Sequence, residues 1–233
     1  MIFVPLILAH LLGDFLLQPN SWVADKEKNK INSPYLYLHV VLHATLALVM
    51  LWDLKLWWIA AVIGVTHFFI DWAKLHFQTR KTKRAWFFVD QLLHLAVIAG
   101  LSWLYFPYWL IDDFLNPTNL RIITALVFLT VPASVIIKTV ISIWTPVAED
   151  QTKIQTASLI NAGKYIGILE RLLVFTFILV NHWEGVGFMI AAKSVFRFSD
   201  LAEAKQRKLT EYVLIGTLLS FGIAIIAAII IKI

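Results

Sequence analysis

The sequence predicts an all-α membrane protein, a polytopic transmembrane bundle of about eight helices. Two observations support this fold class. Of the 233 residues, 60% are hydrophobic and only 15% are charged, and the mean hydropathy is +0.77. Long apolar runs also recur along the whole chain, separated by short polar segments. A chain of this composition needs lipid or a partner to cover its surface.

Eight apolar runs predict the helices in order. The first covers 2–18, and no small-residue cleavage site follows it, so we expect a retained helix and not a signal peptide. Several later runs are short for a membrane span of about 20 residues. These later runs are 36–52, 57–76, 86–106, 121–144, 158–180, 188–206 and 211–231.

Charges in the connecting segments predict how the helices are oriented. Basic residues gather at 26–30, 80–84 and 205–208, and acidic residues mark the opposite side at Asp53, 112–113 and Glu184. By the positive-inside rule, the basic segments face the cytosol and both termini lie on the opposite, outer side of the membrane. We expect this membrane to be a bacterial inner membrane. The net charge of +5 then reflects topology and not a nucleic-acid-binding surface.

Four pairs of ionisable residues, each spaced four apart, lie on four successive apolar segments. This spacing stacks two side chains on one helical face, which is how a helix presents metal ligands. Because consecutive helices alternate in direction, all the pairs are predicted to converge about one to two turns below the cytoplasmic surface. The pairs are His10/Asp14, His39/His43, His67/Asp71 and Asp90/His94.

Two layers of side chains follow from the depth of each pair. The inner layer would contain His10, His43, His67 and His94, and the layer nearer the cytosol Asp14, His39, Asp71 and Asp90. The sequence HLLGD at 10–14 parallels HFFID at 67–71, and HVVLH at 39–43 parallels DQLLH at 90–94. The two hairpins are therefore expected to be related by a pseudo-twofold axis along the membrane normal.

The paired residues favour a metal site. The chain has no cysteine, so nitrogen and oxygen must hold any metal, and imidazole-rich ligation suits one or two Zn²⁺ ions, with Fe or Mn as alternatives. Zinc lowers the pKa of bound water to about 7, which would supply metal-bound hydroxide. We expect Asp14 or Asp90, the carboxylates nearest the cytosolic entrance, to act as the general base. A single His/Asp pair is more often an interhelical hydrogen bond, and a proton or ion relay is the second interpretation.

Further charged residues lie within the predicted helices. In the second half, Glu170, Arg171, Lys193 and Arg197 would be buried, and mutual neutralisation is the plain explanation. A functional alternative is that Arg171, Lys193 and Arg197 bind a phosphate or carboxylate of the substrate. Lys74, on a ligand-bearing segment, could bind an anionic oxygen in the same way or lie at the interface.

Several motifs resemble a known family. The segments LAHLLGDFLLQ, HVVLH, THFFIDWAK and DQLLH resemble the bacterial membrane family catalogued as domain of unknown function 3307, and the similarity is expected to continue through 170–173, 191–198 and 211–221. The HxxxD segments are more loosely similar to LexA-regulated membrane-bound metal-dependent hydrolases. These resemblances imply His10, Asp14, His67 and Asp71 as ligands.

We therefore expect a four-helix metal-binding bundle over 1–106, an external loop over 107–120 and a second helical half over 121–233. The predicted function is metal-dependent hydrolysis of a lipid or amphipathic ester, phosphoester or amide near the cytoplasmic interface, with membrane lipids as partners. A metal-ion or proton-coupled transporter is an alternative, but the segments LALVML, WIAAVIG and LAVIAG beyond the inner layer are apolar. A di-iron oxygenase or desaturase is a further alternative, although the Glu bridges of bundle-type sites are missing.

Overall fold

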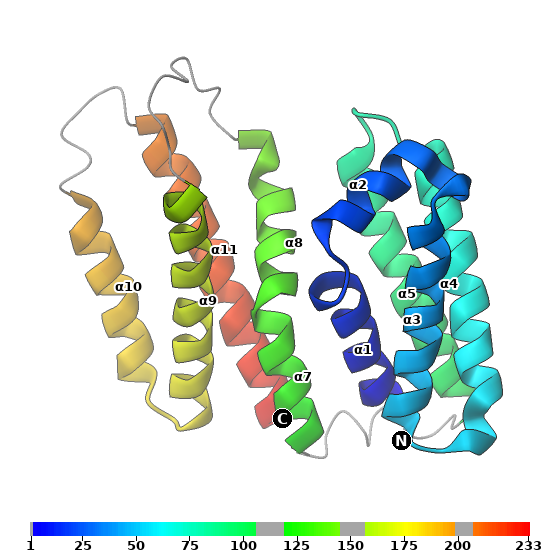
Figure 1. The fold of residues 1–233 in the computed structure, drawn as a ribbon. Coiled ribbons are helices and arrows are strands. Elements are labelled where there is room, and N and C mark those ends of the chain that lie inside the picture. The colour runs from blue at the N-terminus through cyan, green and yellow to red at the C-terminus, as the bar shows by residue number, and fades with distance from the viewer. Residues whose placement is uncertain (1, 106–118, 145–156, 199–206) are drawn as a thin grey trace. The chain divides into compact units, whose positions relative to one another are not determined.

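The computed structural model describes residues 2–105, 119–144, 157–198 and 207–233, and within these ranges every regular element is a helix (Figure 1). The chain divides into two compact units, Met1–Thr124 and Ala125–Ile233. The helices of the first unit are α1 (Phe3–Leu11), a π-helical turn (Leu12–Leu16), α2 (Asn20–Asn29), α3 (Pro34–Leu51), α4 (Trp57–Phe77) and α5 (Lys83–Tyr105).

The first apolar run is helical over Phe3–Leu16, close to the expected 2–18, and the chain turns sharply after it. The axis bends by 82° between Phe3–Leu16 and Asn20–Asn32. Pro19 stands at the bend with extended backbone, φ −63° and ψ 149°, because proline has no N–H to continue a helix and restricts the residue before it. Most of the expected connector is therefore the helix α2, which lies across the end of the unit where α3 begins (Figure 1).

An apolar core fills the other end of the first unit. It is built from α1, α3, α4 and α5, which pack side by side as two hairpins (Figure 1). The buried members of this apolar core are Ile2, Leu6, Ala47, Leu56, Ile59, Ala60, Ile63, Ile98 and Leu101. The paired ionisable residues thus lie between this core and α2.

Helix α7 (Asn119–Leu129) crosses the boundary between the two units, and the longer helices of the second unit are α8 (Val131–Ile141), α9 (Ala157–Leu179), α10 (Trp183–Phe198) and α11 (Arg207–Lys232). The run expected as one helix over 121–144 bends by 41° between α7 and α8, because Pro132 at the start of α8 cannot donate a helical hydrogen bond. The helix expected over 188–206 begins earlier, at Trp183. Of the expected external loop, 107–118 lies outside the described residues, and the last two residues begin α7.

Several helices are long and apolar enough to cross a membrane. Four pass this test individually, namely Pro34–Leu51, Leu54–Phe77, Lys83–Tyr105 and Glu211–Lys232, and the two bent pairs bring the number to six. Large apolar side chains point outward from the middle of these helices, with Val41 60%, Phe69 59% and Leu92 65% exposed. Exposed apolar surface of this kind is typical of a lipid-facing protein.

Candidate metal centre

The four pairs of ionisable residues meet inside the first unit. Each of α3, α4 and α5 contributes one pair, and the first pair comes from α1 and the π-helical turn. Asp14 is the only one of the eight that is not fully buried, with 11% of its side chain exposed. The others are buried, namely His10, His39, His43, His67, Asp71, Asp90 and His94. The structure thus brings the four pairs together, and their depth below the cytoplasmic surface stays a prediction.

The inner layer of histidines is also confirmed. The His67 ring stacks between two others, with its centroid 3.8 Å from that of His43 and 4.0 Å from that of His94. The His10 ring lies 5.2 Å from the His94 ring and 5.7 Å from the His43 ring. Four imidazoles at these separations can share cations.

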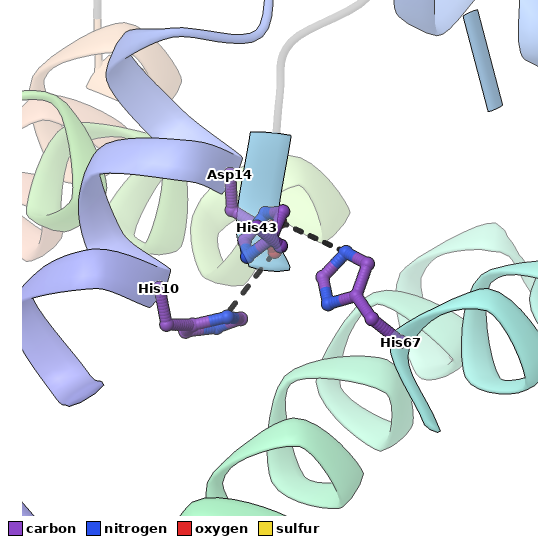
Figure 2. A group of neighbouring side chains, drawn as sticks. All are labelled: His10, Asp14, His43 and His67. Atoms are coloured by element: carbon purple, nitrogen blue, oxygen red, sulfur yellow. Dashed lines mark ion pairs between the residues drawn. The ribbon is translucent and has the colours of Figure 1, made fainter. Parts of the chain in front are cut away.

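Asp14 lies at the centre of the cluster. Its Oδ1 is 3.0 Å from His43 Nε2, 3.2 Å from His39 Nε2 and 3.6 Å from His67 Nε2. Its Oδ2 is 3.7 Å from His10 Nε2. Figure 2 shows His10, His43 and His67 around this carboxylate.

The side chains form three groups, and within each group the potential ligand atoms all lie within 4.8 Å of one another. The first group is His10, Asp14, His43 and His67, the second is His39, His67 and Asp71, and the third is Asp14, Asp90 and His94. Because His67 and Asp14 each belong to two groups, neighbouring sites would share ligands.

The hydrogen bonding of the cluster fits a cation. In the described part of the chain, His43 Nε2, His94 Nε2 and Asp90 Oδ1 are buried and make no hydrogen bond. Although His43 Nε2 lies near Asp14, the angles do not form a hydrogen bond. Buried polar atoms are nearly always satisfied, so unpaired imidazole nitrogens and a carboxylate oxygen in one cluster match the N/O ligands of a divalent metal.

Gln91 links two of the carboxylates through its side-chain amide. Its Nε2 donates hydrogen bonds to Asp14 Oδ2 at 2.8 Å and to Asp90 Oδ2 at 3.2 Å. Its Oε1 lies 3.2 Å from His10 Nε2. Contacts of this kind fix the orientation of metal ligands.

Two lysines also contact the cluster. Lys74 Nζ donates to Asp90 Oδ2 at 2.8 Å, so Lys74 lies at the site, and its role in anion binding stays a prediction. Lys26 Nζ donates to Asp71 Oδ2 at 2.7 Å, and Lys26 is only 6% exposed. Sequence reasoning treated Lys26 as a solvated topological charge, which is wrong. The one feature of the sequence that could have indicated this contact is that three carboxylates within apolar segments need positive charge nearby.

Gly13 is a second residue that sequence reasoning missed. It is buried in the π-helical turn, and a Cβ at this position would lie 2.4 Å from Nε2 and 2.5 Å from Cε1 of His43. Since real Cβ atoms are never this close to another heavy atom, only glycine lets the His43 ring approach the turn. The glycine can be read from the segment HLLGD, but its contact with His43, 30 positions later in the chain, cannot.

The charged residues of the second unit are arranged differently. Arg171 donates from Nε to Leu129 O at 2.7 Å and from Nη2 to Thr130 O at 3.1 Å, at the break between α7 and α8. Lys193 forms an ion pair with Glu170, as expected for neutralisation. The Arg197 side chain lies outside the described residues. The predicted anion site of Arg171, Lys193 and Arg197 has no described contact in its favour.

The comparisons with curated proteins and with solved structures gave no match, so the looser resemblance to LexA-regulated hydrolases stays a prediction. A family model described as protein of unknown function (DUF3307) matches residues 2–120. This range contains all of the paired residues and Lys26, but not the expected extension into 170–221. Because the match covers half of the 233 residues, the chain belongs to the DUF3307 family.

Proposed function

We propose that the first unit binds one or two divalent cations, with Zn²⁺ as the leading candidate and Fe or Mn as alternatives, and that the protein is a membrane-embedded hydrolase. The observation that carries the proposal is the group His10, Asp14, His43 and His67, whose ligand atoms all lie within 4.8 Å of one another in a buried cluster. The donor set of three imidazoles and one carboxylate is typical of zinc sites. We further propose that the whole chain has the eight spans that the sequence predicts.

The first group would hold one cation. A second would be held by His39, His67 and Asp71, or by Asp14, Asp90 and His94. A divalent cation in such a site acidifies bound water and polarises the carbonyl or phosphoryl oxygen of a substrate. This chemistry supports hydrolysis of an ester, phosphoester or amide.

The two candidate bases differ in their surroundings. Asp14 Oδ1 lies within 3.6 Å of three imidazole nitrogens, which favours a ligand role. Asp90 has one oxygen, Oδ2, held by Lys74 and Gln91, while Oδ1 makes no hydrogen bond in the described part of the chain. A fixed carboxylate with one free oxygen can accept a proton, so we assign the general base to Asp90.

The apolar core supports a site that is closed on one side. Leu6, Ile63 and Ile98 line a cavity of about 10 Å³ against the inner histidines, which is room for about one water molecule. A transporter would need a path of polar groups beyond this cavity. The buried residues described there are apolar except Ser102, whose hydroxyl donates to Ile98 O. Substrates would therefore reach the cluster from the α2 end.

We assign the α2 end to the cytosol and both termini to the outside of a bacterial inner membrane, because basic residues gather beside α2 and at 80–84. Single cysteines test this orientation, since the chain has none of its own. A membrane-impermeant maleimide should label Thr82→Cys only from the cytosolic face and Asp113→Cys only from the outer face. The reverse pattern would move the site to the outer face.

Element analysis tests the metal. Protein purified without a metal-affinity tag should hold one or two Zn²⁺ ions per chain, and His67→Ala should lose most of them and unfold at a lower temperature, because His67 belongs to two ligand groups. His76→Ala is the matched control, since His76 is exposed on the same helix. Wild-type protein that is free of metal, and whose thermal unfolding is unchanged by Zn²⁺ or chelator, would contradict the proposal.

A further inference from the structure

Two ammonium groups from different helices lie at one end of the cluster. Lys26 of α2 contacts Oδ2 of Asp71, and Lys74 of α4 contacts Oδ2 of Asp90. The other oxygens of these carboxylates both face His94, with Nε2 3.9 Å from Asp71 Oδ1 and 3.5 Å from Asp90 Oδ1. Asp71 therefore lies between Lys26 and His94, and Asp90 lies between Lys74 and the same His94.

The charge of the cluster changes sign when it takes up cations. With neutral histidines, the three carboxylates and two ammonium groups leave one net negative charge. One divalent cation would give one net positive charge, and two would give three. Net charge in a site that is almost fully buried is costly. Deprotonation of a metal-bound water neutralises a cluster with one cation but leaves two net positive charges on a cluster with two, which favours an anionic ligand.

The lysines are suited to receive that ligand. Each ammonium group has three N–H donors, and its hydrogen bond to Asp71 or Asp90 uses one of them. The remaining N–H groups of Lys26 and Lys74 can donate to a phosphoryl oxygen while Asp90 keeps its contact with Lys74 and acts as the base. Lysine is a compact cation with three donors and a common phosphate ligand. With two cations bound, a neutral ester or amide would leave the positive charge of the site unbalanced, whereas a phosphate ester carries one or two negative charges.

We propose that the substrate of this site is a phosphate ester whose phosphoryl oxygens are bound by Lys26 and Lys74. This inference rests on the proposed metal-dependent hydrolysis. The oxygen of a water molecule bonds to phosphorus and the ester P–O bond breaks. The proton of the water passes to Asp90 and then to the departing alkoxide, so that the products are a phosphate and an alcohol.

The two lysines have different access to solvent. The Lys74 side chain is 26% exposed and that of Lys26 is 7% exposed. Asp25, the neighbour of Lys26, accepts hydrogen bonds from Asn29 and Ser33, which fix the end of α2. The phosphoryl group thus meets Lys74 at the opening and Lys26 in the interior, where α2 is already held in place.

Phosphate binding by zinc-loaded full-length protein tests the inference. Calorimetry with inorganic phosphate should detect binding that disappears on chelation, and Lys26→Met and Lys74→Met should each weaken it about tenfold or more, because hydrogen bonds to charged groups are lost. Lys26→Arg should retain much of the binding. Lys28→Met is the matched control, since Lys28 is exposed on the same helix. Thermal unfolding verifies that each variant is folded.

The metal content of the same samples separates the two proposals. Variants that keep their zinc and bind phosphate as the wild type does would overturn the phosphate-ester inference alone. Wild-type protein that holds no divalent metal would overturn the proposed function and this inference with it. Vesicles that contain phosphatidic acid, compared with soluble glycerol 3-phosphate, identify the source of the phosphoryl group. Hydrolysis of either substrate supports the inference, and its absence for both would count against it.

Discussion

The two units bury charge in opposite ways. In the second unit, the guanidinium of Arg171 makes four hydrogen bonds, to Leu129 O, Thr130 O and the hydroxyl groups of Ser134 and Ser220. In the first unit, the cluster around Asp14 leaves imidazole nitrogens without a hydrogen bond. Arg171 thus satisfies backbone carbonyls and hydroxyl groups within the fold, whereas the unpaired nitrogens of the first unit are the atoms that the proposed cation would bind.

The largest expected effect is on stability, and it tests the role of Arg171 in the second unit. Arg171→Ala should lower the free energy of unfolding by about 3–5 kcal/mol, because it leaves the carbonyls at the α7–α8 break without donors. Its zinc content should equal that of the wild type. Lys138→Ala, which removes an exposed charge of α8, is the control. Denaturation and element analysis measure the two quantities, and loss of zinc in Arg171→Ala would remove the distinction between the units.

Gly13→Ala tests the ligand half without removing any ligand. The added methyl group would displace the His43 ring, since its Cβ would lie 2.4 Å from Nε2. We expect zinc affinity to fall about 100-fold, at the upper end of the effects known for contacts that orient ligands. Gly100→Ala is the control, because its Cβ would meet nothing within 4 Å. Competition with a fluorescent chelator measures the affinity, and equal affinity in both variants would show that the close approach is unimportant.

Gln91→Ala should have the smallest effect of the three. The variant keeps every proposed ligand but loses the hydrogen bonds to Asp14 and Asp90. We expect zinc affinity to fall about tenfold, because the carboxylates are less well oriented. Gln78→Ala, at the C-terminal end of α4, is the control. An unchanged affinity in the same competition assay would make Gln91 a packing residue.

Local patterns in the sequence were enough to predict that the paired ionisable residues meet. A spacing of four on successive apolar segments fixes a helical face, and alternating helix directions bring the faces to one depth. The ring contacts of His43, His67 and His94 confirm this geometry.

The contacts that cross between elements could not be predicted in this way. Lys26 reaches Asp71 only because the chain turns at Pro19 and brings α2 back over the bundle. The Arg171 contacts depend on the bend at Thr130, which removes carbonyls from the regular hydrogen bonding of a helix. Pro19 and Pro132 mark the points where the helices break, but the partners of the freed groups are distant in sequence.

The contact between Lys26 and Asp71 also constrains the order of biosynthesis. The two residues are separated by 45 positions, so α2 leaves the ribosome before its partner on α4 has been made. Asp90 and His94 come later still, on α5. Until α4 is made, Lys26 therefore has water and not Asp71 around its charge. The cluster can form only after α5, which carries Asp90 and His94, has been inserted.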